Sequence, residues 1–128
     1  MIEASDILKM SLEKGVQKYG QLQNVSPPPN WNGNGWERHH IFEQRWADKF
    51  GTTSYSMLAM FVPKDIHNNI SNKLTQKLPS KWTSWMYTKD QIIDLHIEAY
   101  RELYAESGYD EFYEFIYEFS KTRQHTGR

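Results

Sequence analysis

Residues 37–42, with the sequence ERHHIF, decide how the rest of this chain is interpreted. They contain an adjacent histidine pair, His39 and His40, and a further histidine, His67, follows about a helix and a strand later. Histidine is the only side chain whose unperturbed pKa lies near neutral pH, and it is also the commonest metal ligand. A pair can therefore divide two tasks, because one ring can bind a metal ion while its neighbour transfers a proton. The simpler alternative is a solvated pair at the end of a strand.

The histidine pair lies in a predicted short strand, residues 36–42. Successive side chains of a strand point to opposite faces, so the two rings can converge on one site only at a strand end or a bulge. After this strand, the four-residue spacing of Phe42, Trp46 and Phe50 predicts a helix over residues 43–50, which ends at Gly51.

The third histidine is predicted to lie at the start of another helix. An apolar strand over residues 56–62 ends at Pro63, and a helix follows. Three apolar residues share one face of this helix: Ile66, Ile70 and Leu74. His67 falls in its first turn, Ser71 lies one turn later on the same face, and Asn68 lies alongside.

A helix is also predicted at the N-terminal end of the chain. Ser5 or Asp6 can cap this helix, which runs to about Tyr19 and stops at Gly20. The prolines of residues 25–29 then require an extended connector, because each fixes its own φ and excludes the helical region for the residue before it.

Two helices are predicted in the C-terminal third. Residues 88–91, TKDQ, form a capping-box pattern that opens a long helix to about Ser107, and Gly108 stops it. A last helix begins at Asp110 and is apolar almost all round. Such a surface is typical of a core or an oligomer contact, and beside its acidic residues it could also bind a partner.

Length and composition indicate one α+β domain that is mostly helical. At 128 residues the chain fits a single core. It divides into an N-terminal helix with its connector (1–29), a small core of two strands and a helix (36–78) and the C-terminal helices (88–120). We find no secretory signal and no apolar run of the roughly 18 to 20 residues that span a bilayer. Because the chain has no cysteine, a metal ion would be held by histidine, carboxylate or other oxygen and nitrogen groups.

The charges are segregated along the chain, although the net charge is only −1. Residues 30–90 carry eight Lys/Arg and five Asp/Glu, whereas residues 91–119 carry eight Asp/Glu and one Arg. The basic region contains the histidine pair, as expected if a polyanion binds to one face of the protein. The excess of positive charge in that region is small, so chance is the alternative explanation.

Three segments of the sequence resemble one family of nucleases: WERHHIFEQRW (36–46), FVPKDIHNNIS (61–71) and YTKDQIIDLH (87–96). They are similar to the ββα-metal, or His-Me finger, nucleases. More narrowly, they look like the HNH-type toxin domains at the C-termini of bacterial polymorphic and contact-dependent secreted toxins. The resemblance covers residues 36–78 and implies a small ββα-metal core, and the third segment looks like a helix that often follows the motif in these toxins.

The resemblance also implies roles for individual residues. His40 would be the general base, and Glu37 would support the catalytic site. His39 and His67 would ligate one divalent metal ion. The chemistry accounts for these residue types, because phosphodiester hydrolysis needs an activated water and relief of the developing negative charge. Four further side chains would contact the substrate: Arg38, Arg45, Asn68 and Ser71.

The identity of the metal and its remaining ligands stay open at this point. Mg²⁺ tolerates several waters and few protein ligands, whereas two histidines also suit Zn²⁺, Ni²⁺ or Mn²⁺. Ser71 stands where the family has a second helix histidine, so Ser71, Asn68 or water would complete the ligand set. Residues 54–56 lack the asparagine that the family carries at or before its second strand.

A resemblance to secreted toxins implies a biological setting. The domain would be a metal-dependent endonuclease, with DNA favoured as its substrate, that is attached to a larger N-terminal delivery protein and acts in the cytoplasm of the target cell. A cognate immunity protein would bind it in the producing cell. That protein could cover the basic region or the acidic, aromatic segment from Glu98 to Glu118, and the residue types favour the second surface. Within the basic region of residues 30–90, the surface that it could cover lies around Arg38, Arg45, Lys64 and Lys73.

Two other functions fit the same sequence. A ribonuclease could use His40 as acid and base without a metal, and a non-catalytic helical module could bind a partner through its acidic, aromatic end. We assign His96 to packing in a long helix and His125 to a polar tail. The five tryptophans could stack on nucleic-acid bases, although Trp36 and Trp46 are expected to pack around the site.

Overall fold

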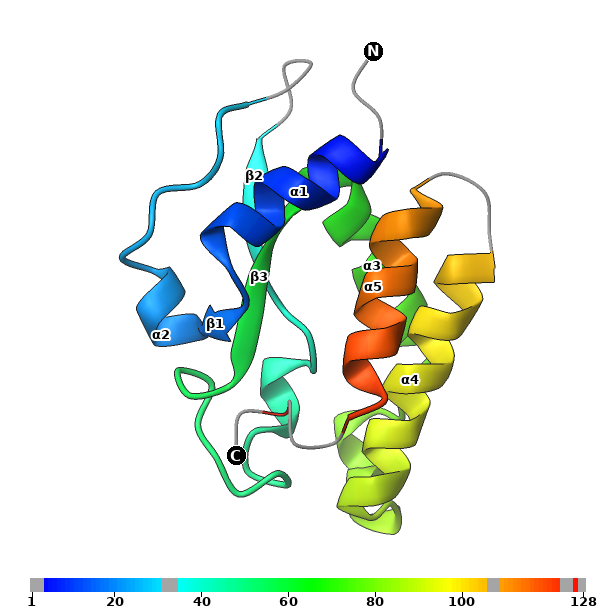
Figure 1. The fold of residues 1–128 in the computed structure, drawn as a ribbon. Coiled ribbons are helices and arrows are strands. Elements are labelled where there is room, and N and C mark those ends of the chain that lie inside the picture. The colour runs from blue at the N-terminus through cyan, green and yellow to red at the C-terminus, as the bar shows by residue number, and fades with distance from the viewer. Residues whose placement is uncertain (1–3, 31–34, 106–108, 123–125, 127–128) are drawn as a thin grey trace.

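The computed structural model describes residues 4–30, 35–105, 109–122 and 126. It is an α+β structure, mostly helical, in which a small sheet lies beside the long C-terminal helices (Figure 1). The elements follow in this order: α1 (Ala4–Lys14), β1 (Gln17–Lys18), α2 (Tyr19–Leu22), β2 (Trp36–His40), η1 (Gln44–Trp46), β3 (Leu58–Pro63), α3 (Lys64–Lys77), η2 (Lys81–Met86), α4 (Lys89–Ala105) and α5 (Asp110–Ser120).

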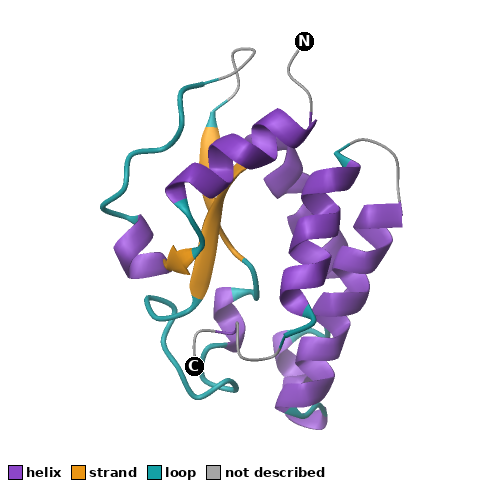
Figure 2. Ribbon diagram, viewed as in Figure 1, coloured by secondary structure: helices purple, strands orange, loops and turns teal. Residues whose placement is uncertain are grey.

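Three antiparallel strands form the sheet, in the spatial order β1-β3-β2 (Figure 2). Strand β2 therefore lies at an edge of the sheet. His39 pairs with Met60 of β3, and His40 pairs with Ala59. Directly opposed residues of an antiparallel pair project from the same face. His39 and Met60 thus share one face of the sheet, and His40 and Ala59 share the other.

The two faces of the sheet carry apolar clusters of different size. Met60 and Val62 belong to the main core, which includes buried side chains of α1, α3, α4 and α5. Ala59 and Phe61 pack with Leu22 of α2 in a small second cluster. Strand β3 is therefore buried on both faces, which accounts for its continuous apolar sequence.

Strand β3 passes directly into helix α3. Pro63 is the last residue of the strand and Lys64 the first of the helix, so the strand lies within one or two residues of its predicted bounds. The three apolar residues predicted to share a face of this helix are buried: Ile66, Ile70 and Leu74. His67 lies in the first turn of α3, close to the end of strand β3.

The first helix ends earlier than predicted. It stops at Lys14 rather than near Tyr19, because Gly15 has a φ of 85°, in the left-handed region that favours glycine. The chain then pairs with β3 through β1, and Tyr19 begins the short helix α2. Gly20 lies inside α2, where a Cβ atom would be 3.4 Å from the carbonyl oxygen of Tyr55. That distance is an ordinary van der Waals contact, so the position does not require glycine, and Gly20 does not end the first helix.

The predicted helix over residues 43–50 is wrong. Only Gln44–Trp46 forms a 3₁₀ turn, and the chain continues in turns. The three residues behind the prediction are nevertheless buried: Phe42, Trp46 and Phe50. Side chains four residues apart can point to the same side in a series of turns as well as in a helix. The backbone N–H of Glu43, at the start of the predicted helix, donates to His96 of α4.

Helix α4 begins with the predicted capping box. The hydroxyl of Thr88 accepts a hydrogen bond from the Gln91 N–H, and the side-chain oxygen of Gln91 accepts one from the Thr88 N–H. The predicted end at Ser107 and the stop at Gly108 lie outside the described residues.

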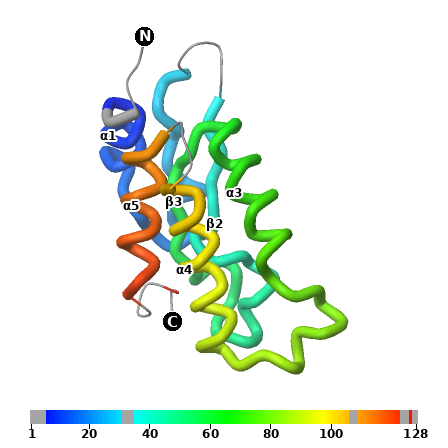
Figure 3. Tube along the Cα trace, turned by 90° about the vertical axis from the view of Figure 1, so that its right-hand side faces the viewer, coloured from blue at the N-terminus to red at the C-terminus, as the bar shows by residue number. Residues whose placement is uncertain are grey.

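Helix α5 begins at Asp110, as predicted, but it is amphipathic. Phe112 and Ile116 are buried in the main core, whereas the three glutamates of the helix are exposed. Figure 3 shows α5 beside α4 and close to α1, and α5 contacts both. None of the described helices is long and apolar enough to cross a membrane.

Candidate active site

His39 is buried on the main-core face of β2, where its side chain is held by helix α4. Its Nε2 lies 2.9 Å from the hydroxyl oxygen of Tyr100, and that hydroxyl donates its hydrogen to the carbonyl oxygen of Ile41. A tyrosine hydroxyl has one hydrogen, so it must accept from His39 Nε2–H. The lone pair of a neutral His39 is then on Nδ1. Burial, and next the neighbouring His67, hold the pKa of His39 well below its ordinary value of 6.5.

His67 is oriented by a carboxylate. Its Nδ1 lies 3.1 Å from Oε1 of Glu37, two residues before His39 on the same face of β2. A carboxylate only accepts hydrogen bonds, so Nδ1 carries the hydrogen and Nε2 keeps the lone pair of the neutral ring. The centres of the His39 and His67 rings are 5.1 Å apart. A histidine whose second nitrogen is bonded to a carboxylate is the usual arrangement of a metal ligand.

His40 occupies a different environment at the end of β2. Its ring stacks on Tyr19 with 4.1 Å between ring centres, and its Nε2 lies 3.1 Å from the carbonyl oxygen of Ser54. Nε2 must donate to that carbonyl, which leaves the lone pair on Nδ1. Partial burial lowers the pKa of His40, partly opposed by the bond to Ser54. The ring is therefore neutral at pH 7, as a general base must be.

The three histidines line one cavity of about 350 Å³. This confirms that the adjacent pair can converge, because His40 is the last residue of an edge strand. The other lining residues come from α2, from the strand and turn around the pair, and from α3: Tyr19, Arg38, Glu43, Gln44, Arg45, Ser71 and Leu74. Glu37 acts behind His67 and does not line the cavity. Asn68 lies on an exposed part of α3 and does not line it either.

Both predicted phosphate-binding arginines line the cavity, and each is anchored at the same time. Arg38 donates to the carbonyl oxygens of Leu22 and Val25 at 2.9 and 3.0 Å. Arg45 donates to Glu43 at 2.9 Å and to the Pro79 carbonyl at 3.1 Å. An arginine carries five N–H donors, so each keeps donors for an anion after making these bonds.

The sequence did not reveal the residues that orient the histidines. Tyr100 lies on α4, four residues after His96, and nothing in that spacing marks it as the partner of His39. Tyr19 was predicted as the end of a helix, and it supports His40 instead. The carbonyl oxygen that Ser54 presents to His40 belongs to the backbone, so no side chain in that segment signals it.

His96 has the packing role that was predicted. It is fully buried, its Nδ1 donates to the Ile92 carbonyl at 2.9 Å, and its Nε2 accepts the Glu43 N–H at 3.0 Å. Burial lowers the pKa of His96 to about 4. Both nitrogens are thus used to hold the turn that follows β2. His125 lies outside the described residues.

The residues fit a sparse metal site. Among the described residues, no group of three or more His, Asp or Glu side chains is placed to hold an ion. His39 and His67 nevertheless supply two ring nitrogens, and Tyr100 and Glu37 set the tautomer of each ring. Ser71, which lies one turn after His67 and lines the cavity, could add a hydroxyl, and water would fill the remaining positions.

Comparison with family models, with curated protein sequences and with solved structures finds no match to this chain. The function must therefore be inferred from the arrangement of its own side chains. That arrangement combines a neutral, oriented base, two candidate nitrogen ligands and two anchored cations around one cavity. Such a cavity can activate a water molecule next to a bound phosphate.

Proposed function

We propose that this protein is a metal-dependent endonuclease of the ββα-metal (HNH) type, and that it hydrolyses phosphodiester bonds, with DNA favoured. One observation carries the proposal: each of the three histidine rings around the cavity has one nitrogen bonded inside the protein and its other nitrogen left for chemistry. A packing role explains one or two such rings. It does not explain three that are oriented separately and share a cavity with two arginines.

His40 is assigned as the general base. The Ser54 carbonyl and the Tyr19 ring hold its imidazole, so Nδ1 is available to take a proton from water. General base catalysis contributes about 10²- to 10⁴-fold to a rate. The orienting acceptor is a backbone oxygen, so the lack of an asparagine in residues 54–56 does not weaken this assignment.

His39 and His67 would hold the divalent ion. When bound, the ion would stabilise the negative charge that develops on the phosphate and on the leaving oxygen. Tyr100 and Glu37 keep the two rings in the tautomers that binding requires, and support of this kind is worth about 10- to 100-fold in metal affinity. The several waters that would complete the ligand set suit Mg²⁺, and the two imidazole nitrogens suit Zn²⁺, Ni²⁺ or Mn²⁺.

The phosphate would be held by cations beside the histidines. Arg38 approaches from the face of the sheet that carries α2, and Arg45 approaches from the turn after β2. Because both guanidinium groups are already anchored, little side-chain entropy would be lost on binding. Ser71 can add a neutral hydrogen bond from α3. Asn68, which faces solvent, would contact only a substrate that extends along the helix.

The order β2, β3, α3 agrees with a ββα-metal core, and the toxin setting is proposed with it. The protein would be a delivered effector, attached to a larger delivery protein and active in the cytoplasm of the target cell. An immunity protein would then bind α5, because its three glutamates are exposed and Glu118 is held only by its neighbour Lys121, whereas Glu98 and Glu102 of α4 are paired with Lys77 of α3. Reversing Glu111, Glu114 and Glu118 to Lys should slow that association at low salt and spare nuclease activity.

A metal-independent ribonuclease is the second candidate. It is favoured by the small number of ligands among the described residues, since a ribose hydroxyl can serve as nucleophile with His40 as base. A plasmid and total RNA should each be incubated with the protein in Mg²⁺, in Mn²⁺ and in EDTA. Nicking of the plasmid that EDTA abolishes supports the endonuclease. Cleavage of RNA that persists in EDTA would establish the ribonuclease, and no cleavage in any condition would leave a non-catalytic interaction module.

A further inference from the structure

The segment between α3 and α4 exposes large apolar side chains that the core does not use. This segment, η2, contains Trp82 and Trp85, which are 88 % and 79 % exposed, and Met86, which is 61 % exposed. None of its six residues is buried. Figure 3 shows the connection between α3 and α4 extending away from the rest of the chain. Exposed tryptophans that contribute nothing to a core are typical of a binding surface.

The helical geometry places both indole rings on one side of η2. In a 3₁₀ helix, side chains three residues apart lie directly above one another, about 6 Å apart along the axis. Trp82 and Trp85 have this spacing. Two hydrogen bonds hold this turn. The Tyr87 N–H donates to the Ser84 carbonyl, and the Ser84 hydroxyl donates to the Lys81 carbonyl. The two indole side chains thus leave the same side of η2.

Basic side chains lie beside Trp85, one of these two tryptophans. A cavity of about 660 Å³ lies between η2 and the segment after β2, and three of its lining residues are cationic and one is acidic. The lining residues are Arg45, Trp46, Asp48, Lys49, Lys81, Ser84 and Trp85. Lys49 is held at the cavity by donating to the Tyr87 carbonyl at 2.7 Å. Cations beside flat aromatic rings match phosphates that alternate with unstacked bases.

The cavity shares one lining residue with the candidate active site. Arg45 lines both cavities, and its bond to the Pro79 carbonyl attaches the segment after β2 to the start of the η2 connection. A strand with one phosphate at Arg45 would therefore have its next nucleotides at Lys49, Lys81 and Trp85, and exposed Trp82 lies three residues before Trp85 on η2. A base-paired duplex offers no free base faces to these rings, because its bases are already stacked on one another.

We propose that Arg45, Lys49, Lys81, Trp82 and Trp85, here called the tryptophan groove, bind an unpaired stretch of nucleic acid next to the phosphate that is cleaved. This inference rests on the proposed nuclease function and deepens it, because it assigns the substrate class. The preferred substrate is single-stranded nucleic acid, or a duplex with an unpaired stretch such as negative supercoiling opens in a plasmid. DNA and RNA share the phosphates and base faces that the groove recognises.

Binding can be tested without cleavage, in EDTA. Fluorescence anisotropy should be measured with labelled 12-nucleotide oligo(dT), the matching oligo(U) and a blunt-ended duplex of the same length. We expect the wild type to bind the single strands at least about tenfold more tightly than the duplex. Trp82→Ala with Trp85→Ala should remove that preference, and the double Trp→Phe variant should keep most of it, because a phenyl ring still stacks.

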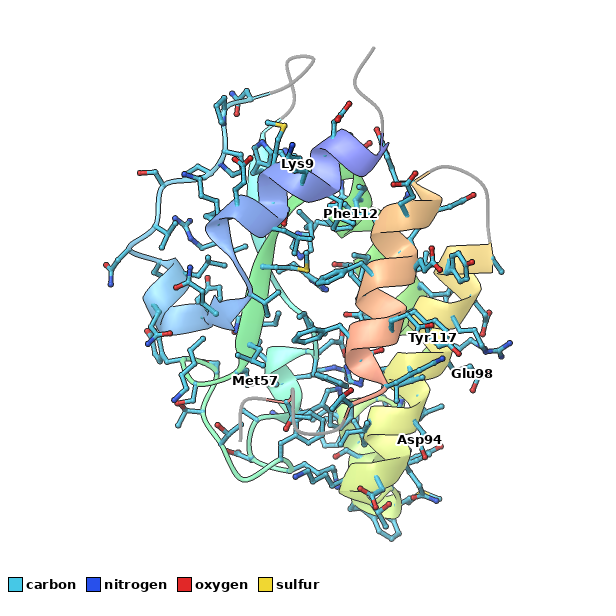
Figure 4. The ribbon with its side chains drawn as sticks, viewed as in Figure 1. Lys9, Met57, Asp94, Glu98, Phe112 and Tyr117 are labelled. Carbon is cyan, nitrogen blue, oxygen red and sulfur yellow. The ribbon has the colours of Figure 1, made fainter. Side chains whose placement is uncertain are left out.

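Two charge-reversal variants control for attraction by the net charge of the protein. Lys81→Glu should weaken binding of the single strands, whereas Lys9→Glu should not. Lys9 is also exposed, but it lies on α1 at the opposite end of the molecule from the first turns of α4, where Asp94 lies (Figure 4). Equal weakening by the two substitutions would indicate attraction by net charge alone and would overturn the groove.

Two further outcomes would also overturn it. One is unchanged oligonucleotide affinity in the double Trp→Ala variant. The other is a wild-type protein that elutes as a dimer while that variant elutes as a monomer, because the tryptophans would then cover a second copy of the chain. The nuclease function is tested separately. If cleavage depends on His40 but the Trp variants bind oligonucleotides like the wild type, the groove proposal is wrong and the nuclease proposal stands. If binding of single strands depends on the tryptophans but no metal ion supports cleavage, the nuclease proposal is wrong and the groove stands.

Discussion

The two faces of strand β2 give adjacent residues different chemistry. On the main-core face, Glu37 and His39 are bonded to side chains, and His39 is only 3 % exposed. On the α2 face, Arg38 and His40 are bonded to backbone carbonyls, and the His40 ring remains partly accessible. A buried neutral nitrogen with a fixed tautomer suits a metal ligand, and a partly exposed one suits a base that exchanges protons with water. The alternation of a strand is therefore enough to give neighbouring residues two different environments.

The largest expected effect distinguishes the two faces by activity. His40→Ala should reduce nicking of plasmid by at least about 100-fold and change the melting temperature little, because the ring contributes a base and only partial burial. His39→Ala, on the other face, should reduce both activity and stability. Nicking assays and thermal unfolding of both variants are the measurements. A folded His40→Ala protein with undiminished nicking would contradict the assignment.

The second prediction concerns the metal. His39→Ala and His67→Ala should each weaken divalent-ion binding by about 100-fold, since a site with two protein nitrogens has none to spare. His40→Ala is the matched control and should retain the affinity of the wild type. Calorimetric titration with Mn²⁺ or Ni²⁺ measures all three. If the first two variants bind like the wild type, neither ring is a ligand.

A smaller effect should follow from removing one hydroxyl. Tyr100→Phe leaves the Nε2–H of His39 and the Ile41 carbonyl without their partner, and an unsatisfied buried group costs about 1–3 kcal/mol of unfolding free energy. Freed from that bond, His39 should also bind metal about tenfold more weakly. Tyr104→Phe, on the same helix but partly exposed, serves as control. Equal unfolding free energies for the two variants in urea would remove Tyr100 from the site.

The smallest expected effect on activity is a shift in the pH dependence of kcat/KM. The proposed general base must be neutral to act, and burial lowers the pKa of His40, so the acidic limb of kcat/KM should be half-complete below pH 6.5. Tyr19→Ala uncovers the ring and should move that midpoint upward toward 6.5. Profiles should be recorded at saturating metal from pH 4 to 8. A wild-type midpoint above 6.5, or no movement in the variant, would show that the Tyr19 stack does not set this pKa.

Buried histidines should also make stability fall on acidification. The folded-state pKa of His96 is about 4, and an unfolded histidine has a pKa of 6.5, so the unfolded state binds more protons between these values. Stability is therefore fully present above pH 6.5 and is lost as pH falls toward 4. The loss from His96 would reach about 3 kcal/mol. This structural titration must be separated from the activity profile by measuring unfolding at each pH.

The prediction from sequence was accurate where the signal is local. The capping box of α4 spans four residues, and the buried face of α3 repeats within one helix, so both were predicted correctly. The end of α1 was not, because Gly15 and Gly20 are both plausible stops and only the pairing of β1 with β3 selects the first. The segment after β2 was misassigned for a similar reason, since the spacing of its buried residues fits turns as well as a helix.

The sequence by itself determined which side chains could carry the chemistry: an adjacent histidine pair, a third histidine at the start of a helix, and basic residues around them. Only the tertiary structure decided which nitrogen of each ring holds the hydrogen. The partners that set this are Tyr100 for His39, Glu37 for His67 and Ser54 for His40, at separations of 61, 30 and 14 residues. A tautomer is chosen by the group that the ring meets in space, and contacts over such separations exist only once the sheet and helices have packed together.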